Sequence, residues 1–152
     1  MSDLSPAIVG AGQGQVIRAF GGEVQIHLAG KDTGGKFTMF TDTVPPGVGP
    51  PPHKHAREDE WFLVLEGSVS YFINGQWTAP AGPGTSAFVP HGTVHAFKNV
   101  GTTPLKQLVT LSPSGFEHFY TKSEQEFARA GGPRMDVIIG IAAEHGITIM
   151  GK

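Results

Sequence analysis

The hydrophobic positions of the chain fall in short runs separated by segments rich in glycine and proline. Three such segments have the sequences PPGVGPPP (45–52), PAGPG (80–84) and PHG (90–92). Because glycine and proline favour turns, the runs between them are interpreted as short strands. These runs cover 37–43, 60–65, 69–73, 85–89, 93–97 and 105–111. Strands this short and this closely spaced predict an all-β sandwich or barrel with frequent turns.

One pair of runs is joined by a recognisable turn sequence. Asn74-Gly75 has the composition of a type I′ turn, in which both central residues adopt positive φ. The flanking segments 69–73 and 76–79 are therefore predicted to form a β-hairpin.

After residue 115 the apolar residues take on helical spacing, in FEHFY (116–120), SEQEFARA (123–130) and MDVIIGIAAEHG (135–146). Gly132-Pro133 separates the last two segments. Ser123 is predicted to cap a helix, with Glu126 completing a capping box, and Gly146 stands where a helix should stop. We expect these helices to pack on the barrel, although their apolar residues could instead form a subunit interface.

The length of 152 residues predicts one compact domain over 1–152. Its barrel core is expected at about 35–112, followed by a short C-terminal helical segment at about 115–146. Neither a repeat nor a second composition regime divides the chain. We expect a homodimer, with the N-terminal strands and C-terminal helices as candidate surfaces.

Charge and composition narrow the function classes. With 11 basic and 13 acidic residues, the chain has neither a nucleic-acid-binding surface nor a polybasic membrane anchor. The start Met1-Ser-Asp-Leu lacks a basic segment before an apolar run, and the longest apolar stretch, around 137–143, is too short to span a bilayer. We therefore expect a cytoplasmic protein. The absence of cysteine excludes disulfides, iron–sulfur clusters and thiolate zinc sites.

Four residues have metal-ligand chemistry: His53, His55, Glu60 and His95. Imidazole and carboxylate ligands together suit iron, nickel, manganese or zinc. On an extended strand His53 and His55 point to the same face, whereas Glu60 has the opposite parity. A turn or bulge within 56–59 is therefore needed before Glu60 can join the two histidines.

Two motifs containing these residues resemble the signatures of the cupin superfamily. The first is Gly47-x5-His53-x-His55-x4-Glu60-x6-Gly67, and the second is Gly84-x5-Pro90-x-Gly92-x2-His95-x3-Asn99. The flanking segments TGG (33–35), REDEWFLVLEG (57–67), SPSGFEHFY (112–120) and AAEHGITIMG (142–151) resemble single-domain quercetin-dioxygenase-like cupins.

The resemblance implies an antiparallel jelly-roll barrel of six to eight strands, with a divalent metal held inside by His53, His55, Glu60 and His95. It also implies a structural role for the motif glycines and for Pro90. Its activity would be that of a metal-dependent dioxygenase acting on a flavonol-like or other enolisable small molecule. Glu60 would then also be the catalytic base. Two alternatives stay open: non-oxidative metal chemistry, as in an isomerase, lyase or decarboxylase, and a non-catalytic small-molecule binding protein.

The remaining candidates receive a structural interpretation. Glu58 and Asp59 are predicted to form a solvated acidic turn or to pair with Arg57 and Lys54. His91 is expected to be exposed, and three further histidines are read as surface or structural residues: His27, His118 and His145. Five aromatic residues could line a pocket or belong to the core, namely Phe62, Tyr71, Phe72, Phe88 and Phe97. Phe62 and Phe97 are favoured as pocket residues because each shares strand parity with a proposed ligand two residues away.

Overall fold

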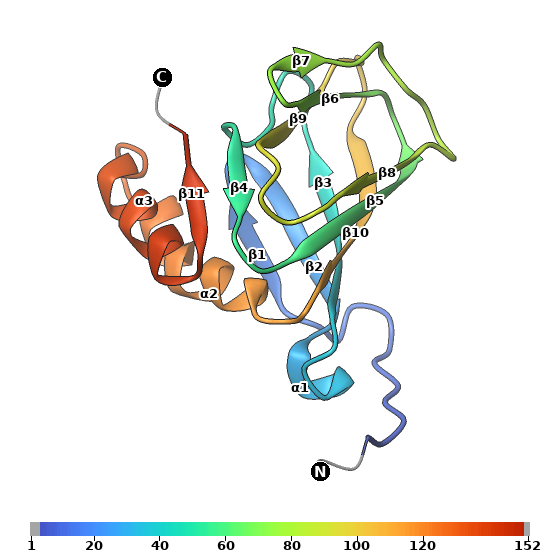
Figure 1. Cartoon of the computed structure of the whole chain (residues 1–152), viewed down its shortest axis with the longest axis vertical. Coiled ribbons are helices and arrows are strands. Elements are labelled where there is room, and N and C mark those ends of the chain that lie inside the picture. The colour runs from blue at the N-terminus through green and yellow to red at the C-terminus, as the bar shows by residue number, and fades with distance from the viewer. Residues whose placement is uncertain (1–3, 151–152) are drawn as a thin grey trace.

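A computed structural model of the chain describes residues 4–150 and contains two antiparallel β-sheets and three helices (Figure 1). The six-stranded sheet has the order β1 (Val16–Ala19), β2 (Gly22–Leu28), β3 (Thr38–Val44), β10 (Leu105–Ser112), β5 (Asp59–Glu66) and β8 (Ser86–Val89). The five-stranded sheet has the order β11 (Ile147–Ile149), β4 (His53–His55), β9 (His95–Asn99), β6 (Val69–Ile73) and β7 (Gln76–Trp77). Residues 1–3 and 151–152, the ends of the predicted domain, lie outside the described residues.

The core lies between the two sheets, because their strands alternate buried and exposed side chains. On β5, Glu60, Phe62 and Val64 are buried, while Trp61 and Leu63 between them are exposed. The all-β jelly roll is thus confirmed. Within residues 4–150 no strand pairing joins the two sheets, so they face each other without closing into one continuous barrel.

The strands follow the predicted runs closely where turn residues bound them. Asn74 and Gly75 have φ of 46° and 91°, and β6 and β7 form the predicted hairpin around them, with β7 shorter than expected. The six-stranded sheet also begins at Val16, ahead of the predicted barrel core. Two strands of three residues each, β4 and β11, are too short to show a period in the sequence.

Three helices accompany the sheets: α1 (Gly30–Thr33), α2 (Phe116–Phe127) and α3 (Met135–Glu144). α2 packs against β1, and α3 packs against α2 and β11, so the two longer helices cover one side of the jelly roll (Figure 1). The predicted break at Gly132-Pro133 separates them, and α3 ends just before Gly146, whose φ is 72°.

The predicted helix cap at Ser123 is wrong. Ser123 lies inside α2, is fully buried, and donates a hydrogen bond to the carbonyl of Phe119 one turn earlier. Its supposed capping partner, Glu126, accepts a hydrogen bond from Nε of Arg134 at 2.6 Å. The helix continues through Ser123 because this residue lies on the same buried stripe as Phe116, Phe119 and Tyr120.

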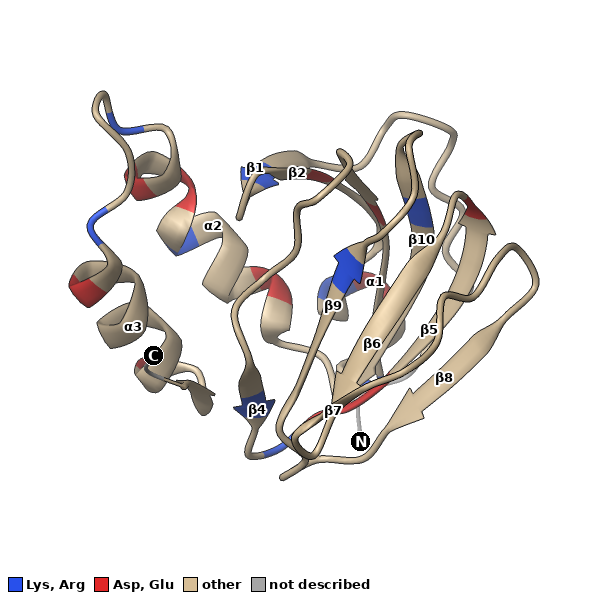
Figure 2. Ribbon diagram, turned by 90° about the horizontal axis from the view of Figure 1, so that it is seen from above, with Lys and Arg blue, Asp and Glu red and all other residues tan. Residues whose placement is uncertain are grey.

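Charged residues are spread over the strands and helices rather than gathered along one element (Figure 2). None of the described helices is long and apolar enough to cross a membrane.

Candidate metal centre

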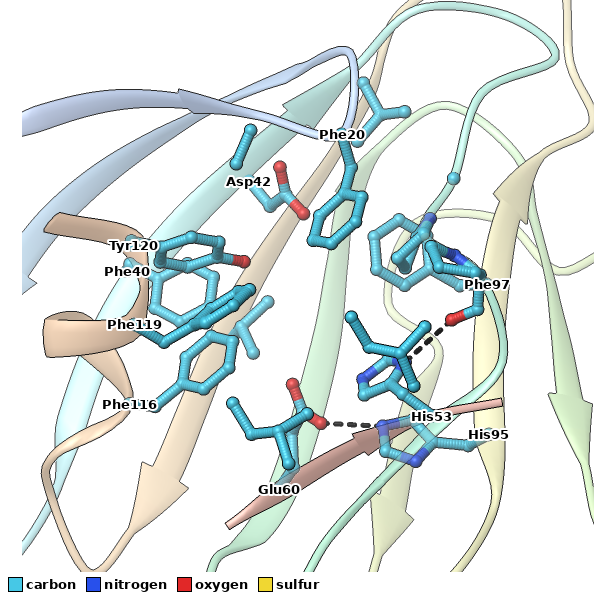
Figure 3. Close-up of a pocket in the computed structure, with 18 of the residues that line it drawn as sticks. Phe20, Phe40, Asp42, His53, Glu60, His95, Phe97, Phe116, Phe119 and Tyr120 are labelled. Carbon is cyan, nitrogen blue, oxygen red and sulfur yellow. Dashed lines mark hydrogen bonds and ion pairs between the residues drawn. The ribbon is translucent and has the colours of Figure 1, made fainter. Parts of the chain in front are cut away.

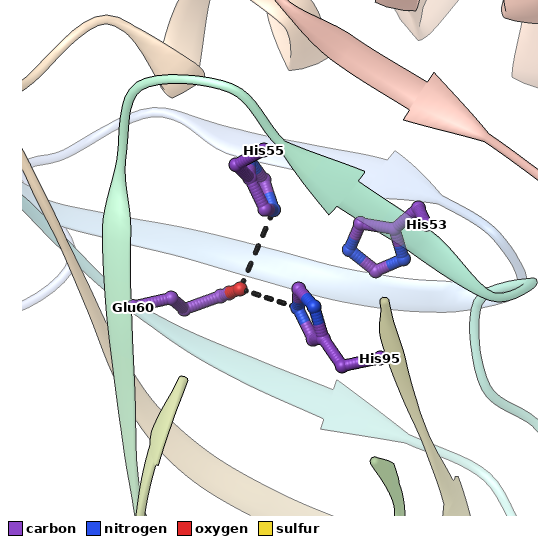
Figure 4. A group of neighbouring side chains, drawn as sticks. All are labelled: His53, His55, Glu60 and His95. Atoms are coloured by element: carbon purple, nitrogen blue, oxygen red, sulfur yellow. Dashed lines mark hydrogen bonds and ion pairs between the residues drawn. The ribbon is translucent and has the colours of Figure 1, made fainter. Parts of the chain in front are cut away.

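Three short strands bring the four predicted ligands together. His53 and His55 lie on β4, Glu60 on β5 and His95 on β9. In the β4–β9 pair His53 is directly opposite His95. One ligand atom from each of the four side chains lies within 4.8 Å of all the others (Figure 4). Strands from both sheets therefore contribute to a three-histidine, one-carboxylate cluster.

The break in strand register that parity required is present. The chain leaves β4 after His55, bends through residues 56–58, and enters β5 at Asp59. This bend transfers the chain from the five-stranded sheet to the six-stranded sheet. Glu60 consequently approaches the histidines from the opposite sheet (Figure 4).

One carboxylate oxygen lies at the middle of the cluster. Oε1 of Glu60 is 2.8 Å from Nε2 of His95 and 3.4 Å from Nε2 of His55. The other ring nitrogens are held from outside the cluster, because Nδ1 of His53 lies 2.9 Å from the Pro51 carbonyl and Nδ1 of His95 lies 3.0 Å from the Thr93 carbonyl. A carbonyl only accepts, so in both rings Nδ1 carries the hydrogen and Nε2 is left for a metal ion.

The donor set fits a divalent transition metal. Imidazole nitrogen with one carboxylate is the ligand combination such ions prefer. Both ring nitrogens of His55 are buried without a hydrogen-bond partner among residues 4–150. Buried polar atoms are ordinarily satisfied, and a cation at the centre of the cluster would satisfy Nε2.

Burial and mutual charge set the protonation states. Burial raises the pKa of Glu60, but its close contacts with His55 and His95 and the charge of these rings outweigh burial and hold this pKa well below its usual range. Burial, together with the other two histidines, lowers the pKa of His53 to about 3. For His55, burial lowers the pKa, but Glu58 and Glu60 outweigh it and raise this pKa to about 9. Glu60 and His53 are thus ready to bind a metal ion, whereas His55 must first lose a proton.

Glu58 is not the solvated residue that the sequence predicted. Its side chain is 3% exposed, and its Oε1 lies 3.8 Å from Nδ1 of His55. Glu58 shares strand parity with Glu60, so the bend that turns Glu60 inward turns Glu58 inward as well. Asp59 points the other way and accepts hydrogen bonds from the backbone nitrogen and from Nδ1 of His91, whose side chain is 62% exposed as predicted.

The cluster forms one end of a cavity with aromatic walls (Figure 3). Phe62 and Phe97, the two favoured aromatic residues, line it together with His53, Glu60 and His95. The other three aromatic candidates lie elsewhere. Tyr71 is in the core, Phe72 packs on Trp77, and Phe88 is 64% exposed.

Sequence reasoning missed much of the cavity wall. The unpredicted lining residues with aromatic or acidic side chains are Phe20, Phe40, Asp42, Phe116, Phe119 and Tyr120. Asp42 has a detectable signal, because it occupies an inward-facing parity position between Phe40 and Val44. Tyr120 and its neighbours come from α2, whose contact with the cavity no local pattern could reveal.

The remaining histidines lie away from the cluster. Nε2 of His27 is 2.5 Å from the Thr41 hydroxyl, and Nδ1 of His145 is 2.9 Å from the Ile141 carbonyl at the end of α3. The first contact joins the neighbouring strands β2 and β3, and the second lies within one turn at the end of α3.

Comparison with known proteins relates residues 40–111 to the family described as the cupin domain. The chain is 29% identical over 115 residues to a quercetin 2,3-dioxygenase from Bacillus subtilis, covering 76% of this chain but only 34% of that protein. It is 32% identical over 93 residues to an oxalate-binding protein from Thermotoga maritima, covering 59% of this chain and 76% of the relative. The chain thus spans about a third of the first relative and three quarters of the second.

A solved structure shares the fold. The crystal structure of a predicted oxalate decarboxylase from Thermotoga maritima superimposes with a TM-score of 0.62 at 26% identity. The match covers 70% of this chain and 99% of that one. The similarity therefore extends over nearly the whole of the smaller protein.

Proposed function

The chain belongs to the cupin superfamily, and we propose that it is a metal-dependent dioxygenase acting on an enolisable aromatic small molecule such as a flavonol. His53, His55, Glu60 and His95 would hold the metal ion. The observation that carries this proposal is the position of the buried cluster at one end of an aromatic-walled cavity. The similarity to quercetin 2,3-dioxygenase supports the same reaction class.

A bound iron, nickel, manganese or zinc ion would leave a coordination position open and lower the pKa of a substrate hydroxyl placed there. The residues of the chain prepare this position. His53 and His95 keep Nε2 free because backbone carbonyls hold Nδ1. The low pKa of Glu60 keeps its carboxylate ionised.

The cavity wall favours a flat substrate of low charge. Phe62, Phe97 and Phe116 offer ring faces and edges for stacking, and they exclude water from the reacting group. Within the described part of the chain, neither lysine nor arginine lines the cavity. A phosphorylated or multiply carboxylated substrate would therefore find no counter-charge except the metal ion itself.

Glu60 is proposed as the base that removes the proton of the substrate hydroxyl. Glu60 supplies the only carboxylate among the four clustered side chains, whose ligand atoms lie within 4.8 Å of one another. A substrate hydroxyl at the open position would lie beside this carboxylate, within reach for proton transfer. Loosening of the carboxylate from the metal would accompany the transfer.

A non-oxidative function of the same site is the second candidate. It is favoured by the 32% identity to a protein named for oxalate binding and by the likeness to a predicted oxalate decarboxylase. In that case the metal would act as a Lewis acid and oxygen would not be consumed.

Metal analysis followed by oxygen uptake tests the proposal. Purified protein is analysed for iron, nickel, manganese and zinc, reconstituted with each, and assayed with flavonols and with oxalate in an oxygen electrode. Oxygen consumption matched to flavonol loss supports the dioxygenase. Product formation without oxygen consumption supports the second candidate, and binding without turnover of any compound contradicts both.

A further inference from the structure

We propose that Asp42 and Tyr120 form a second polar subsite in the cavity, which binds a hydroxyl group at the end of the ligand remote from the metal. The ligand class is then an elongated aromatic molecule with a hydroxyl at each end. This inference rests on the proposed function for the use of the cavity, but it concerns ligand recognition and not the reaction.

The register of the six-stranded sheet separates Asp42 from the metal cluster. On β10, Gln107 pairs with Asp42 of β3 on one side and with Val64 of β5 on the other. Four residues further along β10, Leu111 pairs with Thr38 of β3 and with Glu60 of β5. Thr38 and Asp42 are four residues apart on β3, which corresponds to about 13 Å along a strand.

Both polar groups face the cavity. Figure 3 shows the Asp42 carboxyl beside Phe20 and the Tyr120 hydroxyl turned toward the interior, with Glu60 and His95 lower in the view. Asp42 is 8% exposed and Tyr120 is 7% exposed. No side-chain hydrogen bond among residues 4–150 engages either group, and both line the cavity, so their polar atoms remain available to whatever occupies it.

Both groups need a hydrogen-bond partner from the cavity. A buried polar group without a partner costs about 1–3 kcal/mol, so the carboxyl and the phenol must be satisfied either by water or by a ligand hydroxyl that displaces it. Burial, followed by the charge of Glu60, raises the pKa of Asp42 to about 7. Near neutral pH this carboxyl can therefore both donate and accept a hydrogen bond.

The two groups also set the charge of the ligand. Burial raises the pKa of Tyr120 well above its usual value, with further effects from Asp42 and Glu60, so its hydroxyl remains a neutral donor. Because Asp42 and Glu60 both line the cavity, an anionic group at the remote end of the ligand would be repelled. A neutral hydroxyl, which can donate to Asp42 and accept from Tyr120, suits the pair.

The aromatic rings of the cavity wall account for the aromatic part of the ligand. Phe40, Phe116 and Tyr120 contact one another, with ring centroids 4.7–6.2 Å apart. These rings line the same cavity as the metal cluster and Asp42. A flat ligand between the two polar ends would lie against their exposed faces and edges.

A matched pair of ligands tests the subsite. The probes are a flavonol whose only hydroxyl is the one expected at the metal, and its analogue with one added hydroxyl at the opposite end. Dissociation constants are measured without oxygen on zinc-loaded protein by titration calorimetry. The wild-type protein should bind the analogue about tenfold more tightly, the gain of one good hydrogen bond.

Variants assign that preference to the two residues. Asp42→Ala and Tyr120→Phe should each remove most of the tenfold preference while changing the affinity for the simpler flavonol less than about twofold. Asp42→Asn, which keeps a donor and an acceptor, should retain most of it. Asp136→Asn, on the exposed surface of α3, is the matched control and should retain all of it. Circular dichroism checks that each variant folds.

The outcomes separate the subsite from the reaction. If the wild-type protein does not prefer the analogue, or if Tyr120→Phe keeps the full preference, the subsite is wrong, whether or not flavonols are oxidised. If the preference exists and depends on both residues but oxygen is not consumed, the subsite stands and the dioxygenase proposal fails.

Discussion

Nδ1 of His55 lies 3.8 Å from Oε1 of Glu58, and the two side chains are only 2% and 3% exposed. Neither of these atoms has a hydrogen-bond partner among residues 4–150. A carboxylate behind a metal-binding histidine fixes the ring and increases its basicity. Glu58 is therefore positioned to support the metal site without belonging to the ligand set.

Replacing Glu58 with Gln should lower metal affinity by about 10–100-fold, the usual effect of losing an outer partner of a ligand. A competitive chelator titration measures the change. Asp59→Asn alters the neighbouring carboxylate, which faces His91 at the surface, and should leave the affinity unchanged. Equal affinity in Glu58→Gln and the wild-type protein would remove Glu58 from this role.

Replacing Glu60 with Gln should leave part of the metal bound and abolish turnover. The three histidines still provide nitrogen ligands, but the amide cannot accept the substrate proton. Elemental analysis and oxygen uptake on the same preparation separate the two effects. Activity equal to that of the wild-type protein would show that another group acts as the base.

Metal binding near neutral pH should release about one proton per ion. Glu58 and Glu60 outweigh burial and raise the pKa of His55 to about 9, so the metal-free ring is protonated below that pH, and the metal must displace this proton. Metal affinity should accordingly increase as the pH is raised up to about 9. It should be clearly lower at pH 5 than at pH 8. Calorimetry in buffers of different ionisation enthalpy counts the proton, and metal content unchanged between these two pH values would contradict the site.

The Tyr71→Phe substitution should lower the free energy of unfolding by about 1–3 kcal/mol. The reason is that the Tyr71 hydroxyl donates a 2.5 Å hydrogen bond to Oε1 of Gln107, which is fully buried. Chemical denaturation of the metal-free protein measures this change in the free energy of unfolding. Tyr120→Phe, which removes a buried hydroxyl that lacks such a partner, is the control and should cost less. A larger loss in the control would contradict the assignment.

Metal should stabilise the fold strongly, since its ligands come from both sheets. At a free concentration one hundred times the Kd, binding to the folded state alone adds about 2.7 kcal/mol. The midpoint of thermal unfolding should therefore rise with metal concentration. In Glu60→Ala, which loses the ligand from the six-stranded sheet, this rise should shrink markedly; an undiminished rise would mean that the metal binds elsewhere.

The parts of the structure that were predictable have signals in neighbouring residues. Asn74-Gly75 specifies its hairpin through backbone conformation alone, and strand parity by itself requires a bend between His55 and Glu60. The same parity, applied to Glu58, would have placed it inside. The charged composition of residues 56–59 favoured an exposed Glu58. Its contact with His55, three residues earlier across the bend, places it in the interior instead.

The unpredicted parts depend on packing between distant segments. Ser123 has the composition of a helix cap, yet the buried stripe of α2 extends through it, so tertiary contacts override the local signal. The pairing of β11 with β4 joins segments about ninety residues apart, and the cavity wall from α2 meets strands that lie far from it in the sequence. No periodicity within either segment contains that information.

The pairing of β11 with β4 has a practical consequence for anyone handling the protein. Ile147 and Ile149 lie opposite His55 and His53, so β11 pairs with β4, the strand that carries two of the four candidate ligands. Trimming the chain before Ile147, or attaching a bulky tag there, would remove this pairing and leave β4 without a neighbour on that side. Variants that differ only at this end would then differ in metal content, so low activity in a preparation would call for a check of this strand before a check of the metal supply.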